Sequence, residues 1–294
     1  MSHLATGPLV KMSTEHNNPI SYTLSVGNKD IAINSYIGKK IRIESKSEIR
    51  CLNCQKKTNK SFSQGYCYRC FISLPQCDRC IMSPELCHFE AGTCRDASWG
   101  EEFCMQEHIV YLANSTGVKV GITRHTQVPT RWIDQGAIAA LPMFSVATRY
   151  LSGLVEVIMK EWVADKTNWR KMLKHDVSTI DLVEERVRLM TLAKAPLAEL
   201  QQKFPGQITA LTDEETWEFE YPSIQWPEKI KTFNLDKLPI VEGTLLAVKG
   251  QYLILDTGCF NVRKHTSYDV SFCVESSEAQ DISSAPELNI TDNL

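Results

Sequence analysis

Apolar and polar residues alternate in two stretches that lie near opposite ends of the 294-residue chain. Residues 20–45 contain short runs of this kind, the last of which alternates strictly about Ile41 and Ile43. Residues 242–273 show a similar series of short runs between glycine-containing turns. Because side chains on a strand point alternately to its two faces, this pattern predicts β-strands. We therefore expect small β elements at both ends of the chain, either as two sheets or, the arrangement we favour, as one barrel closed by the termini.

In the middle of the chain, apolar residues recur with the period of an α-helix. Residues 152–165 and 178–195 place apolar side chains three and four positions apart, and the second stretch opens with Ser178 and Thr179, residue types that cap helices. Before them, residues 110–124 have the pattern of a hairpin, which is followed by a short helix and an apolar third strand. The predicted order is strand, strand, helix, strand, helix, and the chain is expected to be an α+β protein.

Composition restricts the class of protein. With 43% hydrophobic and 23% charged residues the chain can form a globular core, and its net charge of -3 argues against a uniformly basic protein that coats nucleic acid. The middle differs, because residues 105–175 carry nine Lys and Arg against five Asp and Glu. Residues 275–294 carry only acidic charges and few large apolar side chains, which predicts an acidic disordered tail. The sequence lacks an apolar run that could span a bilayer or act as a signal peptide, so we expect a cytoplasmic protein without a membrane partner.

Nine of the eleven cysteines fall within residues 51–104. Cys51 and Cys54 form one C-x2-C pair, and Cys67 and Cys70 form another after twelve intervening residues. Four thiolates at this spacing are typical ligands of a tetrahedral structural Zn²⁺ site of the zinc-ribbon type. The alternatives are disulfides, which a reducing cytoplasm disfavours, and free buried thiols. Because four protein ligands leave no open position for a substrate, the metal is expected to stabilise the fold rather than to catalyse.

A second set of four cysteines follows the first and predicts a second structural zinc ion. Its members are Cys77, Cys80, Cys87 and Cys94. Their spacing is less regular than that of the first set, so either His88 or Cys104 is an alternative for one of them. The expected number of structural zinc ions is therefore one or two.

The residues around the predicted hairpin occur in an order known from a nuclease superfamily. Ile109-Val110-Tyr111 and Lys119-Val120-Gly121 stand at the places of two tripeptides, ahead of Arg131 in the first helix, Glu156 in the second, and Asn168 twelve residues later. With the order of elements, they make the middle segment resemble the GIY-YIG nuclease superfamily. It departs from the superfamily at Ile109, which replaces glycine, at Lys119, where tyrosine is usual, and at Gln135, near the place of a histidine. Over most of its length the chain is also similar to an uncharacterised bacterial zinc-ribbon family of unknown function.

The resemblance implies a mechanism of phosphodiester hydrolysis. Tyr111 would orient or deprotonate the attacking water, Arg131 would hold the phosphate, and Glu156 would bind one Mg²⁺ or Mn²⁺ ion. A tyrosine with an ordinary pKa of about 10 needs a nearby positive charge to act as a base, and Lys119 would supply it if the two are cross-strand neighbours. Asn168 would complete the catalytic set. The implied partner is nucleic acid, either DNA or RNA.

Each of these residues also has a structural interpretation. Tyr111 can be an ordinary half-buried strand tyrosine, and Lys119 can lie on a solvated face. Arg131 can stack on the ring of the adjacent tryptophan, Glu156 can pair with a cation inside the fold, and Asn168 can cap a turn.

Two other places carry candidate polar residues. His108, just before the hairpin, is a zinc ligand, a site residue or neither. The stretch NVRKHTSY, residues 261–268, can contact a phosphate backbone or form an ordinary exposed turn.

Three functions stay open on this basis: a divalent-metal-dependent nuclease, a zinc-ribbon module that binds nucleic acid without cutting it, and a zinc-stabilised scaffold for protein interactions. Tyr111, Arg131 and Glu156 together favour the first, whereas Lys119 favours the second. The predicted segments are an N-terminal β-rich segment (1–50), a zinc-binding segment (51–104), a GIY-YIG-like α/β domain with a following helix (105–204), a linker or strap (205–230), a C-terminal β-rich segment (231–274) and the acidic tail (275–294).

Overall fold

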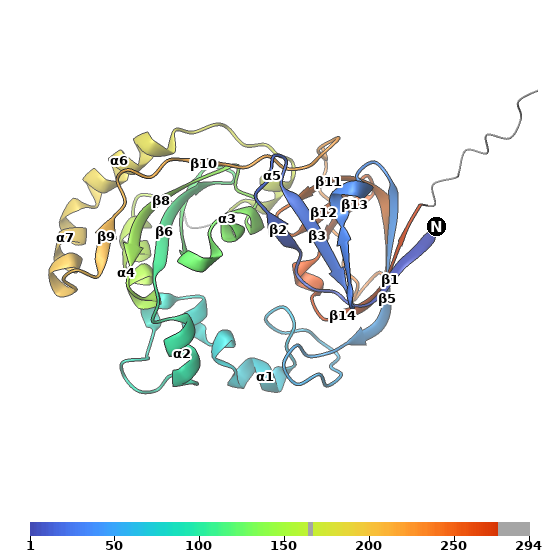
Figure 1. The fold of residues 1–294 in the computed structure, drawn as a ribbon, viewed down its shortest axis with the longest axis horizontal. Helices are drawn as coiled ribbons and strands as arrows, with labels where there is room; N and C mark the ends of the chain where they lie inside the picture. Colours follow the sequence, from blue (N-terminus) through green and yellow to red (C-terminus); the bar gives the residue numbers. More distant parts are fainter. Residues whose placement is uncertain (164–166, 276–294) are drawn as a thin grey trace, which may run out of the picture.

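The computed structural model describes residues 1–163 and 167–275, so nearly all of the predicted acidic tail lies outside the described residues. Helices and sheets are mixed, which confirms the α+β class. A β domain and an α/β domain lie side by side in Figure 1, and the cysteine-rich segment runs below both.

The β domain is built from both ends of the chain. Its larger sheet has the strand order β1-β14-β5-β11-β12-β13, and its smaller sheet has the order β2-β3-β4. The strands of the larger sheet are β1 (Ser2–Pro8), β5 (Lys40–Ile49), β11 (Ile240–Lys249), β12 (Tyr252–Leu255), β13 (Gly258–Asn261) and β14 (Tyr268–Val274). The smaller sheet contains β2 (Ser13–Glu15), β3 (Ser21–Val26) and β4 (Lys29–Ala32), followed by the short 3-10 helix η1 (Ile33–Tyr36).

Strand β5 joins the two terminal segments, because it pairs with both β14 and β11. Ile41 and Ile43 are fully buried, as their alternation predicts, and Ile43 lies opposite Phe272 of β14. The strand order ends at β1 and β13. Among the residues described, the terminal segments therefore share one open sheet, rather than the closed barrel or the two separate sheets considered from the sequence.

The α/β domain contains the predicted order of strand, strand, helix, strand, helix. Its elements are β6 (His108–Asn114), β7 (Val118–Arg124), the turn η5 (His125–Gln127), α3 (Thr130–Asp134), β8 (Ala139–Val146) and α4 (Arg149–Met159). Central β6 pairs antiparallel with β7 and with β8. Its side chains alternate between two cores: Tyr111 packs into a core shared with the β domain, whereas Val110 and Leu112 pack into one formed with α4 and later helices.

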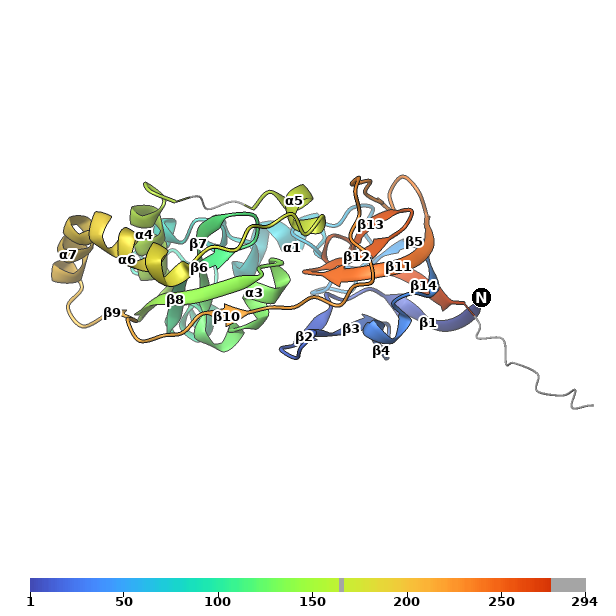
Figure 2. The same ribbon diagram turned by 90° about the horizontal axis from the view of Figure 1, so that it is seen from above.

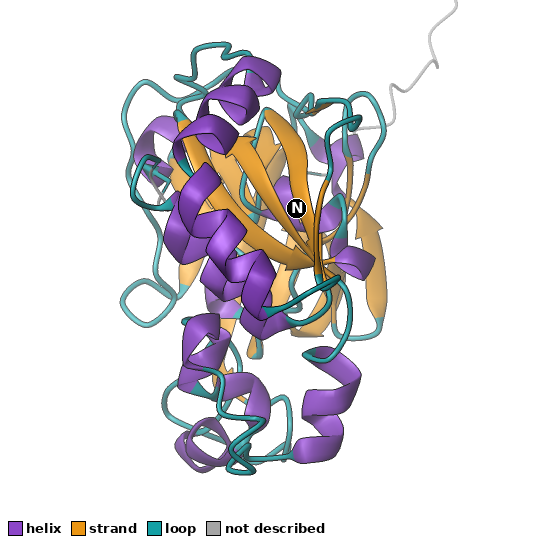
Figure 3. Ribbon diagram, turned by 90° about the vertical axis from the view of Figure 1, so that its left-hand side faces the viewer, coloured by secondary structure: helices purple, strands orange, loops and turns teal. Residues whose placement is uncertain are grey.

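Three further helices follow α4: α5 (Trp169–Leu173), α6 (Leu182–Leu192) and α7 (Lys194–Lys203). Figure 3 shows helices packed across the face of the central sheet. The start of α6 differs from the prediction. Its N-cap is Asp181, whose carboxylate accepts hydrogen bonds from the backbone N–H groups of Val183 and Glu184, and not the Ser178-Thr179 pair.

The acidic, proline-containing stretch at 205–230 is a strap along the edge of the central sheet. Its strands β9 (Ile208–Ala210) and β10 (Trp217–Glu218) both pair with β8. The strap then crosses to the β domain, as Figure 2 shows. Buried Tyr221 ties the strap to the α/β domain just before this crossing, because its hydroxyl donates a hydrogen bond to the Ala137 carbonyl at 2.7 Å.

The cysteine-rich segment consists mainly of loops. Its helices and turns are α1 (Tyr68–Ser73), η2 (Pro75–Cys77), η3 (Arg79–Ile81), η4 (Pro84–Leu86) and α2 (Ala97–Phe103). The turn η4 packs against α4, where a Cβ on Gly153 would come within 2.5 Å of the Glu85 backbone nitrogen. Glycine at this position therefore allows the segment to lie directly on the helix that carries Glu156.

Candidate functional site

The first four predicted zinc ligands lie together. Cys51 follows β5, Cys54 lies in the next turn, and Cys67 and Cys70 belong to the start of α1. Their four sulfur atoms lie within 4.8 Å of one another, and the Cys54 and Cys67 sulfurs are 3.8 Å apart. Sulfurs at about 2.3 Å from a zinc ion form a tetrahedron with edges of about 3.8 Å. The cluster can therefore hold zinc through four thiolates.

Polar groups around this cluster favour a negative sulfur at Cys51, whereas the pKa of Cys70 is raised, because the hydrogen bond from Asn53 that lowers it is outweighed by burial and the three neighbouring thiols. Burial opposes ionisation of Cys51, but hydrogen bonds from the backbone of Cys54, Cys67 and Asn53 bring the pKa of its thiol down to about 6. The Asn53 side-chain amide also donates a hydrogen bond to the sulfur of Cys70 at 3.4 Å. Thiolate is the form that binds zinc, so these donors suit a metal site.

The second predicted set is not assembled as a group of four. Cys80, Cys87 and Cys94 line a small hollow together with Cys104. Cys77 is not among the residues that line it. Cys80 also lies near Asp78 and His88, and one ligand atom from each of these three residues lies within 4.8 Å of the others.

A basic cavity of about 350 Å³ lies where the two domains and the cysteine-rich segment meet. Six cationic side chains and two carboxylates contribute to its wall, so positive charge predominates. These residues are Lys11, Lys119, Arg124, Arg131, Arg149, Arg263, Asp134 and Glu156. Asp134 is paired with Lys11 and also accepts a hydrogen bond from Gln251 at 2.8 Å, so its charge is largely compensated within the protein.

The arginines of the cavity are close enough to affect one another. Burial lowers the pKa of Arg149, and the charges of Arg131 and Arg124 lower it further. Burial and the charge of Arg131 likewise lower the pKa of Arg263. Like charges that lower one another's pKa repel, and an anion between them relieves this repulsion. The arrangement therefore suits an anionic ligand with several oxygens, such as phosphate.

Three of the five predicted catalytic residues line this cavity. Lys119 comes from β7, Arg131 from α3 and Glu156 from α4. The Glu156 carboxylate lies 3.2 Å from the ammonium of Lys160, one helical turn later. Lys119 is buried, which is inconsistent with the alternative that it merely lies on a solvated face.

Tyr111 and Lys119 meet at Gln135. Tyr111 lies opposite Gly121 and Ala113 lies opposite Lys119, so the expected cross-strand pair is in fact a diagonal pair. The Tyr111 hydroxyl donates a hydrogen bond to Gln135 Oε1 at 3.2 Å, and the Lys119 ammonium donates to the same oxygen. A Cβ on Gly121 would lie 2.7 Å from the Tyr111 hydroxyl oxygen. Glycine is therefore required beneath the tyrosine ring.

Tyr111 is fully buried and is not part of the cavity wall. Burial raises the pKa of its phenol, despite the opposing effects of Arg131 and Gln135. At neutral pH the hydroxyl is therefore protonated. The neighbouring Trp132 packs edge-on against the Tyr111 ring, with 5.5 Å between ring centres.

Asn168 and His108 lie outside the cavity. Asn168 caps α5, because its side-chain oxygen accepts a hydrogen bond from the backbone nitrogen of Lys171 at 3.3 Å. His108 is fully buried, its Nδ1 lies 2.7 Å from the Gln106 carbonyl oxygen, and burial lowers its pKa to about 4. Neither residue belongs to a cysteine group among the described residues.

A larger groove, of about 1010 Å³, has the opposite electrostatic character. Asp181, Glu218 and Glu220 line it, and His16 and His175 are the basic-type side chains in its wall. This acidic lining is unfavourable for phosphate, so the smaller basic cavity is the better candidate site for that ligand.

Comparison with known proteins places the chain in a family. The family model described as Protein of unknown function (DUF2797) matches residues 38–270. The chain belongs to this family. The matched range includes both cysteine groups and every charged residue of the cavity wall except Lys11. No curated protein and no solved structure matches the chain. In the part of the chain that the structure describes, no helix is long and apolar enough to cross a membrane.

Sequence reasoning missed Lys11, Asp134 and Arg149 among the charged residues of the cavity. Lys11 precedes a short strand and Arg149 follows a helix cap, and neither stands in a pattern that indicates a binding site. Arg263 could be predicted from the sequence as a candidate, because it belongs to the basic stretch 261–268, for which a contact with phosphate is one of two interpretations. The fold alone brings Lys11, Arg149 and Arg263 to the same cavity.

Proposed function

We propose that this protein binds the phosphate backbone of a nucleic acid in the basic cavity and hydrolyses a phosphodiester bond there with a divalent cation held by Glu156. One observation carries the proposal: arginines from α3, from α4 and from the turn η6 (Arg263–His265) converge on the cavity that contains the Glu156 carboxylate. Phosphoryl transfer depends mainly on positioning the phosphate and neutralising its charge. A pocket with four guanidinium groups and two carboxylates, one of them paired with Lys11, is suited to both tasks.

Each cavity residue has a distinct place in this chemistry. Arg131 and Arg263 carry planar groups that can donate paired hydrogen bonds to phosphate oxygens, and Lys119 adds a more compact charge. Glu156 suits Mg²⁺ or Mn²⁺, because Mg²⁺ commonly binds proteins through one or two carboxylates and completes its shell with water and substrate phosphate. When bound, the cation supplies charge neutralisation and an activated water.

The α/β domain resembles the GIY-YIG superfamily in two further respects that support the proposal. Its elements follow the order expected from the resemblance. Gly121, the glycine of the second tripeptide, leaves the space that the Tyr111 ring occupies. Because Tyr111 is buried and protonated, we assign it a positioning role: with Gln135 it holds Lys119, while water activation falls to the metal.

Binding without cleavage is the second candidate function. It is favoured by the burial of Tyr111, which leaves the cavity without a tyrosine that could act as a base. In this case the arginines would bind the backbone and Glu156 would serve only to orient Lys160.

A cleavage assay distinguishes the two candidates. Single- and double-stranded DNA and RNA are incubated with Mg²⁺ or Mn²⁺ and the wild-type protein, with Glu156→Gln, or with the control Glu161→Gln, which alters an exposed carboxylate on the next turn. We expect the Glu156 variant to lose activity by about 100-fold or more, the effect of removing a major electrostatic group from an active site. We expect the control to cut normally. Equal cleavage by both variants, or none by the wild type, contradicts hydrolysis at this site.

Salt-dependent binding tests the cavity independently of cleavage. We expect wild-type affinity for a short labelled strand to fall steeply with salt, and Arg131→Ala and Arg263→Ala each to weaken binding and reduce the slope by about one released counterion. Arg188→Ala is the matched control, because Arg188 is paired with Glu185 on α6, outside the cavity wall. If wild type does not bind at low salt, both nucleic-acid functions are wrong and the scaffold function is favoured.

A further inference from the structure

Four thiols of the cysteine-rich segment face one small hollow that is separate from the first cysteine cluster. The hollow has a volume of about 10 Å³, which is room for a single water-sized particle. Cys80 lies in η3, Cys87 follows η4, Cys94 lies in the next loop and Cys104 follows α2. The four thiols thus lie on four successive short segments of the chain.

The four sulfur atoms are not yet gathered as tightly as those of the first cluster. Among the described residues, no three of them lie within 4.8 Å of one another. A zinc ion in the hollow would replace the thiol protons and draw the sulfurs to about 2.3 Å from the metal.

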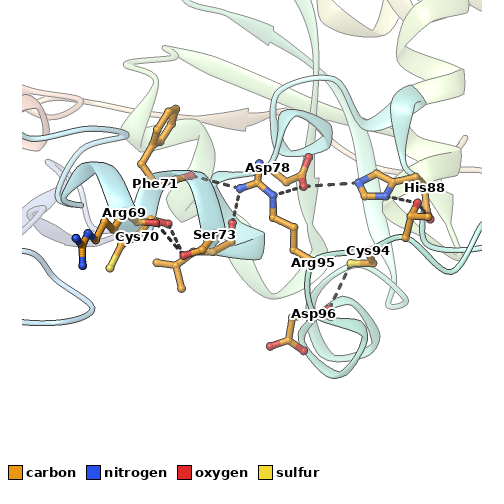
Figure 4. Close-up of polar contacts among 11 residues, drawn as sticks. Arg69, Cys70, Phe71, Ser73, Asp78, His88, Cys94, Arg95 and Asp96 are labelled. Carbon is orange, nitrogen blue, oxygen red and sulfur yellow. Dashed lines mark hydrogen bonds and ion pairs between the residues drawn. The ribbon is translucent and has the colours of Figure 1, made fainter.

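Asp78 and His88 are near Cys80, but other partners occupy them. Arg95 Nε lies 2.7 Å from an Asp78 carboxylate oxygen, and His88 Nε2 lies 3.6 Å from the same oxygen. The other ring nitrogen of His88 is hydrogen-bonded to Thr93 at 2.8 Å. Figure 4 shows Arg95 reaching from Asp78 to a backbone carbonyl of α1, so this network links the two halves of the segment.

Cys77 does not line the hollow, whereas Cys104 does. Cys104 is therefore the better fourth ligand for a metal bound there.

Arg149 provides a counter-charge for a negatively charged metal site. Its backbone nitrogen donates a hydrogen bond to the Cys104 carbonyl at 2.8 Å, and its guanidinium donates one to the Ile81 carbonyl, next to Cys80. Its Nε is buried and has no hydrogen-bond partner among the residues that the structure describes. Two of the four thiols thus lie beside an arginine with an unused donor.

We propose that Cys80, Cys87, Cys94 and Cys104 bind a second structural zinc ion as four thiolates, with Arg149 as their charge partner. Zinc with four thiolates carries two net negative charges, which the guanidinium balances in part. On binding, Cys94 loses its proton and with it the hydrogen bond to the Asp96 carbonyl at 3.3 Å. The site fixes the segment against α4 and orients Arg149 at the edge of the basic cavity. It does not depend on the proposed function.

Zinc content of purified variants tests the ligand set. We expect two zinc ions per chain in wild type, one in Cys104→Ser, and two in Cys77→Ser and His88→Ala. Cys259→Ser is the control for loss of a buried thiol, because Cys259 lies in β13, and it should keep both ions. If Cys77→Ser or His88→Ala loses an ion while Cys104→Ser keeps two, the proposed ligand set is wrong.

A titration of the wild-type chain needs no variant and covers the case in which Cys104→Ser fails to fold. The metal is stripped and Co²⁺ is added, whose thiolate charge-transfer band reports the number of sulfur ligands. We expect the band to grow up to two equivalents of Co²⁺, with about half of the final intensity from each site. Growth that stops at one equivalent, or a second equivalent that adds no charge-transfer intensity, overturns the proposal.

Discussion

Lys249 is buried although its side chain ends in an ammonium group, which is normally charged and surrounded by water. It is fully buried at the end of β11, with its ammonium 5.0 Å from the centre of the Tyr221 ring and 5.5 Å from that of Trp226. The ammonium also lies 2.8 Å from Nδ1 of His175, a nitrogen that accepts the hydrogen bond when the ring is neutral. Burial lowers the pKa of Lys249 to about 7 and that of His175 to about 4. Aromatic faces and one imidazole thus replace the water that surrounds a lysine ammonium in solution.

This environment makes stability depend on pH. The pKa of Lys249 is about 7 in the folded chain and 10.5 in its ordinary state. Between these values the unfolded chain binds one proton more than the folded chain, so the free energy of unfolding rises with pH by about 1.4 kcal/mol per unit, whereas below pH 7 the contribution is constant. We expect Lys249→Met, which keeps the apolar stem, to remove this rise.

Urea unfolding between pH 7 and pH 9, with zinc held constant, measures the effect. Exposed Lys264→Met is the matched control and should retain the wild-type slope. Identical slopes for wild type and Lys249→Met would show that Lys249 remains charged throughout this range.

At the scale of secondary structure, the sequence was sufficient to predict an element or a ligand pair where the residues that define it are close together in the chain. The strands around Ile41 and the first C-x2-C pairs were predicted because alternation and ligand spacing are properties of short stretches. The start of α6 was wrong because Asp181, rather than the earlier Ser178, has the side chain that reaches the free N–H groups. The strap was only partly predicted. An acidic, proline-containing stretch has no strand pattern of its own, and β10 exists because β8 offers it an edge.

For the candidate site, too, the sequence predicted the residues that are close in the chain and missed those that the fold brings together. The hairpin and its two helices placed Lys119, Arg131 and Glu156 in one domain from the sequence alone, and the cavity contains all three. Lys11 and Arg263 come from opposite ends of the chain, and their convergence follows from the terminal segments sharing one sheet. Such long-range neighbours leave no periodic trace in the sequence. The cysteines that line the second hollow were mispredicted in part for the same reason, because the turns between cysteines decide that Cys104 lines it and Cys77 does not.

The whole molecule combines apolar cores, the largest of which is shared by the two domains, with a segment that lies outside them. The core of the β domain extends into the α/β domain through Tyr111, Trp132 and Ile133, so the two domains are packed as one body. None of the buried apolar clusters takes a side chain from residues 50–108, a range that the structure describes in full. The cysteine-rich segment is held instead by the packing of η4 against α4 and by hydrogen bonds and ion pairs such as those of Arg95, to which a zinc ion at the first four cysteines would add.

Removal of zinc should consequently unfold this segment before the rest of the chain. Structural zinc contributes on the order of 10 kcal/mol in small domains, more than the polar ties can replace. We expect chelation to make residues 51–104 susceptible to protease and fast in amide exchange, while β6 and β11 stay protected by the shared core. Mass spectrometry of the fragments and peptide-resolved exchange give the boundaries, and added zinc should restore protection. Cys54→Ser should reproduce the loss around the first cluster without chelator. Uniform exposure of all elements would mean that the metal supports the common core as well, and unchanged protection of 51–104 would show that polar contacts hold the segment by themselves.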